Sequence, residues 1–397
     1  MVADPNTPLA ERPRDIETPD REGDSPEHLP IVVVGAGLAG LVAARLLKAA
    51  GYGVEILEKS RGTGGRLNTR REGALHLDRG VRYWSDRGVL SRQLRRGLVG
   101  RGVLGSWTSP AYCLDGQGNR TLSDEPRYVA PNGLSTIAKA LADELPIRFN
   151  RRAMLLDRSP VTPDLWRVRC DRPRPDASPE PPDQFEARAL LLAAPAPQTA
   201  ALLNSLGTLD PQCAHYFANV AYGPCLTVTA GYGMDVDLDS APWQGWGSIN
   251  FEGDRDLIWL SREDRKQVDA PEPAIMLQTT AEGAEPYIDL EGDALAAAGT
   301  ALLKLASDRT ALPLDQADWV RVHRWRYGTV QRAAGVPCLI LGGDRWPPLV
   351  CAGDWCIGDG IEAALQSGVA AAQYLAKRLG DRPLIPPDTD LDLATLL

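Results

Sequence analysis

The chain has 397 residues, of which 44% are hydrophobic and 24% charged, and this balance excludes a wholly disordered, collagen-like or coiled-coil protein. At about 150 residues per domain, the length predicts two or three domains with room for a large core and a sizeable ligand. The net charge of −9 argues against a duplex nucleic acid as a partner, because that ligand usually requires a basic face. A membrane-spanning helix needs about 20 apolar residues, and the uncharged stretch 29–44 contains Pro30 and several glycines, so no membrane span is expected.

The first 29 residues carry eight acids, three arginines and five prolines. They contain too few apolar groups to offset the entropy of ordering, so they are predicted to form a disordered acidic tail. This stretch lacks the basic start and apolar centre of a signal peptide, which makes a cytoplasmic location the default expectation. The seven cysteines form no C-x-x-C pair and the four histidines are not spaced as metal ligands, so a reduced chain without a metal site is expected.

The ordered chain is predicted to begin with a βαβ unit. A short β-branched strand at 31–34 is followed by glycines, an apolar helix at 38–50 and a second strand at 52–57. A glycine-rich loop, Arg61 to Arg66, comes next in place of the next helix of a plain nucleotide-binding domain.

The remaining elements suggest two intertwined parts. We expect a strand near 74–77, helices at 89–98 and 134–144, and strand-like pieces around 107 and 113. Segments 154–156, 166–170 and 185–192 are predicted to form a small antiparallel sheet, with the Pro- and acid-rich stretch 171–184 as an exposed insertion. A mixed region follows, with strands at 226–230, 257–260, 275–280 and 319–325 and a helix at 295–305, and a strand at 350–352 and a helix at 361–378 close the fold.

Three glycines mark a dinucleotide site. Gly35 permits a tight turn, Gly37 lets the backbone approach a pyrophosphate, and Gly40 lets the helix pack close to the strand. Phosphates would lie at the helix N-terminus, where free N–H groups and the helix dipole favour anions. The motif follows a strand, opens a helix and precedes Glu58 at the end of the next strand, which is the context that a dinucleotide site requires.

The cofactor is expected to be FAD. Glu58 would accept hydrogen bonds from the ribose hydroxyls and repel a 2′-phosphate, which favours FAD or NAD over NADP. The 61–66 loop supplies N–H groups and a guanidinium for a longer cofactor, and a second signal lies near the C-terminus. There Asp354 follows a strand and could bind ribityl hydroxyls, and a helix beginning at Ile361 could stabilise negative charge on a reduced flavin.

With these motifs the sequence resembles the flavin-containing amine oxidase superfamily, and within it the renalase-like proteins. The matching stretches are IVVVGAGLAGL (31–41), EKSRGTGGRLNTRR (58–71), LDRGVRYW (77–84), PNGLSTIAKALA (131–142), HRWRYG (323–328) and CAGDWCIGDGIEAALQSGVAAA (351–372). The second and the last are specific, and the first is generic.

The resemblance implies an α/β plus α+β architecture. A Rossmann-type FAD-binding domain is assembled from separate segments, and a substrate domain with a mixed sheet is inserted between them. In this chain the FAD-binding domain would comprise 30–86, 126–204 and 338–380, the substrate domain 87–125 and 205–337, and the C-terminal tail 381–397.

The resemblance also implies the cofactor contacts. It puts Gly35, Gly37 and Gly40 on the pyrophosphate, with Leu38, Ala39, Lys59 and Gly65 in the same loops. Glu58 would bind the ribose, the Ala153 backbone the adenine, and Arg61 and Arg66 would lie near the phosphate and ribityl chain. Arg82 and Tyr83 would lie beside the isoalloxazine, Asp354 on the ribityl chain or pyrophosphate, and Ile361 at the helix dipole end. One position departs from the family, whose members commonly carry a glutamine where this chain has Arg82.

The lysines favour the renalase-like branch. Amine oxidases of the monoamine and polyamine type usually keep a lysine that holds a water at flavin N5. None of the six lysines here is expected in that place: Lys48, Lys59, Lys139 and Lys377 lie in elements of the FAD domain, Lys304 on the long helix and Lys266 in a charged loop, 262–266.

The expected reaction is oxidation of a misreduced dihydropyridine isomer of NAD(P)H at flavin N5, with reoxidation of the flavin by dioxygen to give hydrogen peroxide. No catalytic base is assigned, because aromatisation of the dihydropyridine drives hydride transfer. Candidates for the substrate face are Arg82, Trp84, Trp246, His323, Trp325 and Tyr327, with Arg326 as a further polar candidate. Two alternatives remain: an amine oxidase or desaturase-like dehydrogenase on another small molecule, and a flavin-binding protein with a structural or regulatory role whose acidic tail binds a partner.

Overall fold

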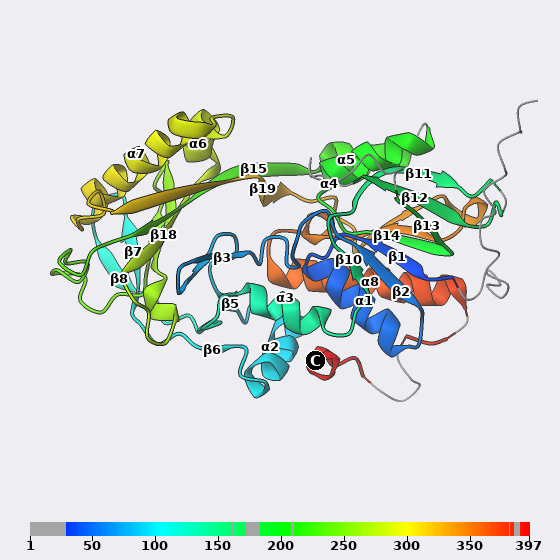
Figure 1. Cartoon of the computed structure of the whole chain (residues 1–397), viewed down its shortest axis with the longest axis horizontal. Helices are drawn as coiled ribbons and strands as arrows, with labels where there is room; N and C mark the ends of the chain where they lie inside the picture. The colour runs from blue at the N-terminus through cyan, green and yellow to red at the C-terminus, as the bar shows by residue number, and fades with distance from the viewer. Residues whose placement is uncertain (1–28, 161, 172–182, 208–209, 381, 385–389) are drawn as a thin grey trace, which may run out of the picture.

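The structure is a computed structural model that describes residues 29–160, 162–171, 183–207, 210–380, 382–384 and 390–397. The predicted acidic tail, apart from residue 29, and most of the predicted 171–184 insertion lie outside the described residues. Figure 1 shows two parts side by side, a Rossmann-type sheet with its helices on one side and a larger mixed sheet on the other, joined by the long strands β15 and β19.

The Rossmann sheet has six strands in the order β10-β2-β1-β14-β21-β20. The first five are parallel to one another and β20 is antiparallel. Their bounds are β1 Ile31–Val34, β2 Val54–Leu57, β10 Ile147–Arg148, β14 Ala189–Leu192, β20 Leu339–Leu341 and β21 Leu349–Cys351. Every residue of β1, β14 and β21 is buried, which explains why these strands are continuous apolar runs.

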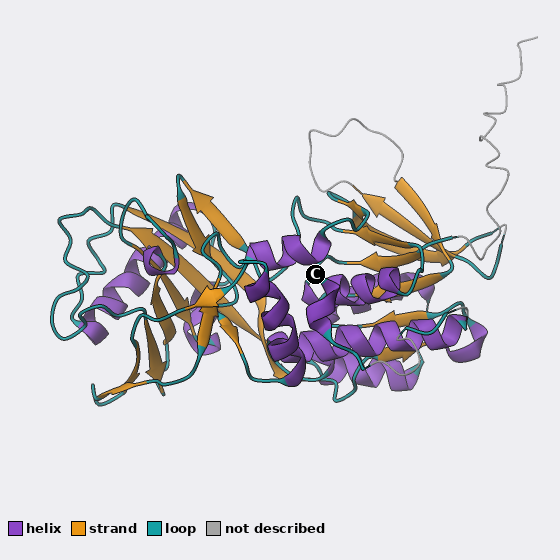
Figure 2. Cartoon of the chain, turned by 90° about the horizontal axis from the view of Figure 1, so that it is seen from below, coloured by secondary structure: helices purple, strands orange, loops and turns teal. Residues whose placement is uncertain are grey.

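One face of this sheet is covered by helices (Figure 2). They are α1 Leu38–Ala49, α3 Ser135–Ala142 and α8 Ile361–Leu379, and a further helix, α2 Val89–Gly100, packs against α8. A Cβ on Gly368 would lie 2.5 Å from the Ala39 carbonyl oxygen, so only a glycine lets α8 pack this closely on α1. The chain end also belongs to this core: the short helix η7 (Leu393–Leu396) packs on α2 with Leu393 fully buried.

The opposite face is covered by a second, antiparallel sheet and two helices. The sheet comprises β11 Arg152–Arg158, β12 Trp166–Asp171 and β13 Asp183–Ala187, followed by α4 Ala196–Leu203, η2 Asn204–Leu206 and α5 Pro211–Asn219. The prediction of one strand over 185–192 is wrong. That segment divides at Arg188 into β13, which pairs with β12, and β14, which pairs with β1, because an apolar run does not reveal which sheet each half joins.

The second part of the molecule is a seven-stranded sheet in the order β19-β15-β18-β17-β16-β7-β8, flanked by the long helix α7 (Gly292–Thr310). Its strands are β7 Ala111–Asp115, β8 Arg120–Leu122, β15 Ala221–Gly231, β16 Ser248–Glu252, β17 Leu257–Arg262, β18 Ala274–Thr279 and β19 Trp319–Arg332, and the short helices are η3 Asp264–Lys266, α6 Ala281–Ala284 and η4 Glu285–Tyr287. The sheet is mixed because β16 and β7 pair in parallel and all its other pairs are antiparallel.

Small elements connect the two parts. A hairpin of β3 (Thr69–Glu72) and β4 (Leu75–Asp78) follows the glycine-rich loop, and only its second strand was expected from the sequence. A three-stranded sheet combines β5 Trp84–Ser85, β9 Arg127–Val129 and β6 Gly105–Ser106, and the short helices η5 Gly343–Arg345 and η6 Asp354–Cys356 flank β21. The division into domains stays a prediction, but α2, assigned to the substrate domain, packs in one core with α1 and α8.

Candidate cofactor and substrate site

The three glycines at the start of α1 differ in what surrounds them. Gly35 has φ +107°, and a Cβ on Gly40 would lie 2.2 Å from the Gly35 carbonyl oxygen, so both positions require glycine for the fold itself. A Cβ on Gly37 would meet no protein atom within 4 Å. Since α1 has no side-chain cap, its first N–H groups face this open space, which suits the close approach of an anion such as a pyrophosphate.

Glu58 is fixed beside this turn. Its carboxylate accepts hydrogen bonds from the backbone N–H groups of Ala36 at 2.8 Å and Ser60 at 2.7 Å. Its carbonyl oxygen accepts a bond from Arg151 N, two residues before Ala153 on β11, so the predicted ribose and adenine contacts lie close together in the fold. Lys59 instead turns away and donates to the side chain of Gln198 at 3.1 Å.

Arg66, at the end of the glycine-rich loop, pairs with the buried carboxylate of Asp354. Arg66 Nη2 lies 2.6 Å from Asp354 Oδ1, and Arg66 Nη1 donates to the Gly328 carbonyl at 3.2 Å. Burial acts to lower the pKa of Arg66, but the charge of Asp354 and its hydrogen bond raise that pKa overall. The glycine-rich loop and the C-terminal segment that carries Asp354, 288 residues apart in sequence, therefore lie in contact, as the predicted cofactor contacts require.

The start of α8 also keeps its N–H groups free. Gly360 at the N-cap supplies no side-chain hydrogen bond. The carboxylate of Glu362, in the first turn, turns to the start of α2 and accepts from Leu90 N and Ser91 N at 3.2 and 2.7 Å. The positive end of the α8 dipole at Ile361 is thus not neutralised by its own first turn.

A loop following β4 is held by side chains of the seven-stranded sheet. The Arg79 carbonyl accepts from Thr227 Oγ1 at 2.6 Å and Trp325 Nε1 at 2.7 Å. The Gly80 carbonyl accepts from Gln278 Nε2 at 2.7 Å. Three side chains from β15, β18 and β19 thus fix the loop that carries Arg82 and Tyr83, the residues predicted to lie beside the flavin ring.

Arg82 is a half-buried cation without a carboxylate partner among the described residues. Its Nε donates to Gln278 Oε1 at 2.7 Å, and its guanidinium lies 5.4 Å from the Trp259 ring centroid. Burial lowers the pKa of Arg82. Because Gln278 binds both Arg82 and the Gly80 carbonyl, it sets the orientation of the guanidinium. The neighbouring Tyr83 packs against Trp259 with ring centroids 5.5 Å apart.

His323, Trp325 and Tyr327 lie on β19 near this loop. The His323 and Trp325 rings meet edge to face at 4.4 Å, and Arg79 Nη1 lies 3.5 Å from His323 Nδ1. Burial, with the charges of Arg79, Arg324 and Arg70, lowers the pKa of His323 to about 4. Tyr327 contacts Tyr222 at 5.4 Å between ring centroids. The structure thus gathers Arg82, His323, Trp325 and Tyr327 where β15 and β19 approach the Arg79–Tyr83 loop.

The lowered pKa of His323 predicts a pH dependence of stability. In the unfolded chain this imidazole takes up a proton below pH ~6.5, whereas in the fold it stays neutral down to about pH 4, so stability present above pH 6.5 is lost as the pH falls through this window. Urea unfolding gives the free energy of unfolding at pH 7 and at pH 5. Between these two pH values the free energy of unfolding should fall by on the order of 2 kcal/mol more in the wild type than in the His323→Gln variant. The exposed His215→Gln change is the control, and equal pH dependence of all three proteins would refute this assignment.

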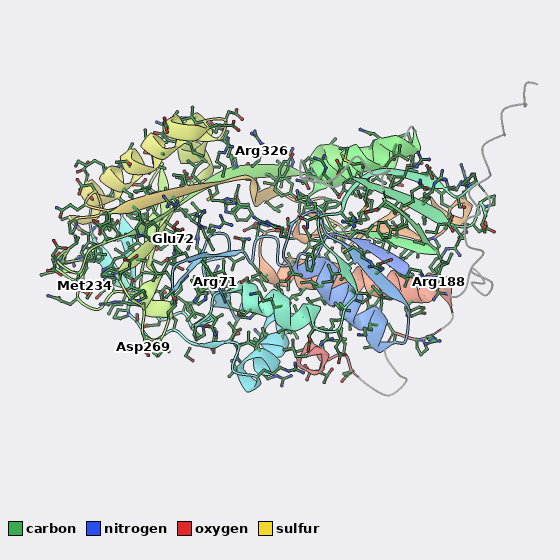
Figure 3. The ribbon with its side chains drawn as sticks, in the orientation of Figure 1. Arg71, Glu72, Arg188, Met234, Asp269 and Arg326 are labelled. Atoms are coloured by element: carbon green, nitrogen blue, oxygen red, sulfur yellow. The ribbon has the colours of Figure 1, made fainter. Side chains whose placement is uncertain are left out.

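Three other substrate-face candidates lie elsewhere. Trp84 and Trp246 are fully buried and pack in the cores of the two parts, where their indole N–H groups donate to the carbonyls of Ser91 and Leu238. Their size and apolar character, which suggested substrate contact, serve packing. Arg326 is exposed and pairs with Asp289 at 2.8 Å, on the outer side of β19 (Figure 3).

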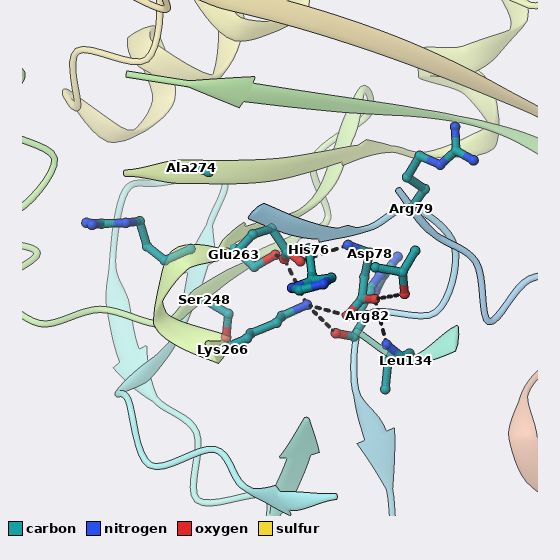
Figure 4. Close-up of polar contacts among 12 residues, drawn as sticks. His76, Asp78, Arg79, Arg82, Leu134, Ser248, Glu263, Lys266 and Ala274 are labelled. Carbon is teal, nitrogen blue, oxygen red and sulfur yellow. Dashed lines mark hydrogen bonds and ion pairs between the residues drawn. The ribbon is translucent and has the colours of Figure 1, made fainter. Parts of the chain in front are cut away.

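The sequence did not indicate that Lys266 is buried, because its neighbours in the chain are charged and predict an exposed loop. Arg262 ends β17, and Lys266 closes the turn η3 with only 2% of its side chain exposed. Figure 4 shows its ammonium among three oxygen partners: Glu263 Oε1 at 2.8 Å, Asp78 Oδ2 at 3.5 Å and the Arg82 carbonyl at 2.8 Å. The simple charged loop predicted at 262–266 is therefore wrong. Lys266 contacts the backbone of Arg82, which the resemblance puts beside the isoalloxazine, so the position of the lysines does not distinguish the renalase-like branch.

This buried group of charges links the two parts. Asp78 accepts from Thr69 Oγ1 and from Leu134 N just before α3, and Glu263 accepts from Ser261 Oγ and from Asp78 N. Burial raises the pKa of Glu263, and the charge of Lys266 acts in the opposite direction. Lys266 thereby holds the backbone of Arg82 from one side while Gln278 holds its side chain from the other.

The residues that reasoning from the sequence missed are Arg79, Thr227, Gln278, Glu263 and Lys266. Arg79 belongs to the LDRGVRYW stretch (77–84), whose match to the family was the available signal for this residue. Thr227 and Gln278 each lie on buried strands, where a polar residue in an apolar run indicates a specific partner, and this pattern was the available signal for both.

The residues around the start of α1 fit FAD. Gly37 leaves space that a Cβ would fill, the N-terminus of α1 has free N–H groups, and Glu58 lies beside this space. Among the described residues no group of three or more His, Cys, Asp or Glu side chains is arranged to hold a metal ion. Within the same ranges, none of the helices combines the length and apolar character that crossing a membrane demands.

Comparison with known proteins agrees with this geometry. A family model for NAD(P)-binding Rossmann-like domains matches residues 33–96, and a model for flavin-containing amine oxidoreductases matches residues 85–376. The chain is 54% identical over 50 residues to an L-amino-acid oxidase of Notechis scutatus scutatus, and 37% identical over 79 residues to an all-trans-retinol 13,14-reductase of Macaca fascicularis. These matches are local, covering 13% and 20% of this chain and only 9% and 12% of the relatives' lengths.

A solved structure shows the similarity of the fold over nearly the whole chain. A triple mutant of putrescine oxidase superposes with a TM-score of 0.66 at 13% identity, covering 88% of this chain and 99% of that one. At this identity the match shows the fold alone, and it confirms the predicted class of a Rossmann-type FAD-binding domain combined with a mixed sheet. Since the second family model covers most of the chain, the chain belongs to the flavin-containing amine oxidoreductase family, with FAD as its cofactor.

Proposed function

We propose that this FAD-dependent oxidoreductase is a renalase-like oxidase, which oxidises a dihydropyridine isomer of NAD(P)H to NAD(P)+. The substrate loses a hydride, and dioxygen with a proton is reduced to hydrogen peroxide, so electrons and protons balance. In support, the candidate substrate face carries Arg82 and Arg79 without any hydrogen bond or ion pair to a carboxylate among the described residues. This single observation carries the proposal.

The net charge of the substrate distinguishes a dihydropyridine nucleotide from an amine. A primary amine is a cation at neutral pH, and two unpaired guanidinium groups repel it. A dihydropyridine nucleotide carries a pyrophosphate anion, which arginine side chains bind through charge-assisted hydrogen bonds. The neutral state of His323 at pH 7, which follows from its lowered pKa, leaves the substrate face with no additional positive charge near Trp325.

We also propose roles for the chain's own groups. Gly37, Glu58, Arg66 and Asp354 hold the cofactor, as the resemblance implies, and the free start of α8 faces the flavin ring. Bound FAD supplies the hydride acceptor and, once reduced, the electrons for dioxygen. Trp325 and Tyr327 offer flat apolar surfaces against which a dihydropyridine ring can be held, and their bulk excludes water. A cytoplasmic location stays a prediction.

Peroxide release distinguishes the substrates. The holoprotein should release hydrogen peroxide with 2- or 6-dihydropyridine isomers of NADH or NADPH, and give no such signal with a panel of primary amines, polyamines and L-amino acids. Turnover of an amine together with no turnover of any dihydropyridine isomer would contradict the proposal and favour an amine oxidase.

Replacement Arg82→Gln tests the charge argument. Loss of a charge-assisted hydrogen bond to the nucleotide should raise KM for the dihydropyridine substrate about 10- to 100-fold, because such a bond contributes ~1.5–3 kcal/mol. The exposed Arg101→Gln change alters the net charge equally at the end of α2 and should leave KM unchanged. If KM of Arg82→Gln stays at the wild-type value, Arg82 does not bind the substrate.

A further inference from the structure

A cationic cavity lies beside the glycine-rich loop, and Arg61 and Gly65, which the resemblance puts on the cofactor, are among the residues that line it. It has a volume of about 390 Å³ and is bordered by residues 60–65, by the β3–β4 hairpin and by the start of α3. This volume is enough for a small organic ligand with a phosphate group. Figure 3 shows Arg71 on the hairpin that forms one wall.

Three cations from three different elements surround this cavity: Arg61 on the loop, Arg71 on β3 and Lys139 on α3. Within the part of the chain that the structure describes, none of their side chains has a hydrogen bond or an ion pair. No carboxylate of the described residues lines the cavity, and the acid next to Arg71 in sequence, Glu72, is engaged by Arg70 at 2.9 Å and Arg321 at 3.4 Å. In a chain with a net charge of −9, such an unneutralised group is unexpected.

The hydroxyl groups around the same cavity complete an environment for an anion. Ser60, Thr63 and Ser135 all line it, and Ser135 is the first residue of α3. Hydroxyl donors, guanidinium groups and an ammonium from separate elements are the combination that binds phosphate oxygens.

Apart from Arg61 and Gly65, the residues that the resemblance puts on the cofactor do not line this cavity. The neighbouring Gly64 pairs with Gly37 at the start of α1, and a Cβ on Gly64 would lie 3.2 Å from Ala138 of α3. Neither Glu58 nor Arg66 lines the cavity, and Arg66 turns inward to Asp354. Arg61, which the resemblance puts near the cofactor phosphate, lines this cavity.

We propose that this cavity is a second anion site that binds a phosphate group while FAD occupies its own site. The ligand is free phosphate or the phosphate end of a small phosphorylated molecule. Its binding joins the loop, the hairpin and α3, and so stabilises the folded holoprotein. The proposal does not depend on which substrate the flavin oxidises.

Calorimetric titration and thermal unfolding of the FAD-loaded protein test this site, with inorganic phosphate and with AMP as probes at constant ionic strength set by chloride. We expect saturable binding of at least one probe and a rise in Tm. The double variant Arg71→Gln/Lys139→Gln should weaken binding about tenfold or more, with the ratio of flavin to protein absorbance unchanged. The matched double variant Arg101→Gln/Arg345→Gln removes the same charge from exposed sites elsewhere and should bind like the wild type.

Three results would overturn the proposal: no saturable binding of either probe by the wild-type holoprotein, equal weakening in both double variants, or loss of FAD from Arg71→Gln/Lys139→Gln. The last result would make the cavity part of the cofactor site. Tighter binding of AMP than of phosphate identifies a phosphorylated molecule as the ligand, and equal binding identifies free phosphate. Peroxide release by wild type is recorded in parallel, so failure of the anion site and failure of the proposed oxidase activity remain distinguishable.

Discussion

A Gly37→Val protein should fold normally and be purified without FAD. A Cβ at this position meets no protein atom within 4 Å, so the fold leaves room for a branch there, and the added side chain fills the space before the free N–H groups of α1. Loss of two or more hydrogen bonds to a charged pyrophosphate, each contributing ~1.5–3 kcal/mol, weakens FAD binding about 100-fold or more. The measurements are the ratio of flavin to protein absorbance and the Kd for added FAD.

Gly105→Val is the matched control. A Cβ on Gly105 also has no neighbour within 4 Å, and this glycine lies on β6, where a β-branched residue suits the extended backbone. This control should retain FAD. An unchanged FAD affinity in Gly37→Val, with both variants showing the wild-type Tm, would remove Gly37 from the cofactor site.

Lys266→Met should destabilise the protein by about 3–5 kcal/mol, the cost of leaving buried carboxylates without their counter-charge. Asp78 and Glu263 have 2% and 0% of their side chains exposed, so water cannot replace the ammonium. The variant also loses the hydrogen bond to the Arg82 carbonyl, and we expect a raised KM for the substrate in the protein that remains folded. Urea unfolding gives the change in free energy, and steady-state kinetics give KM.

Two further variants separate charge from packing. Lys304→Met breaks an exposed, solvent-screened ion pair with Asp308 and should unfold at nearly the same urea concentration as the wild type. Adding Glu263→Gln to Lys266→Met removes one of the uncompensated charges and should restore a substantial part of the lost stability. If Lys266→Met unfolds at the same urea concentration as wild type, the buried charges do not stabilise the junction of the two parts.

The cofactor half of the site could be predicted from the sequence because its signals are local. The order of strand, glycines, helix and Glu58 specifies a turn, a helix N-terminus and a neighbouring carboxylate within a few residues of one another, and the structure has them together. The meeting of Arg66 with Asp354 was implied only by the resemblance, since nothing in either segment indicates a partner 288 residues away.

The substrate half could be predicted only in part. His323, Trp325 and Tyr327 stand in one recognisable stretch of β19 and lie together in the fold. Trp246 was misleading because an isolated tryptophan suits a core as well as a ligand face. Lys266 was missed because its neighbours Arg262 to Arg265 suggest a solvated run, whereas its partner Asp78 comes from a strand 188 residues earlier. Long-range pairing of buried charges leaves no periodic pattern in a sequence.

The central proposal is that a dihydropyridine nucleotide reduces the flavin directly. It is tested most directly by mixing the FAD-loaded protein with 2- or 6-dihydro isomers of NADH without oxygen and following flavin absorbance in a single turnover. We predict rapid bleaching by at least one isomer, formation of NAD+ in equal amount, and no bleaching by a primary amine at the same concentration. Bleaching by an amine with none by any dihydropyridine isomer would contradict the proposed substrate class.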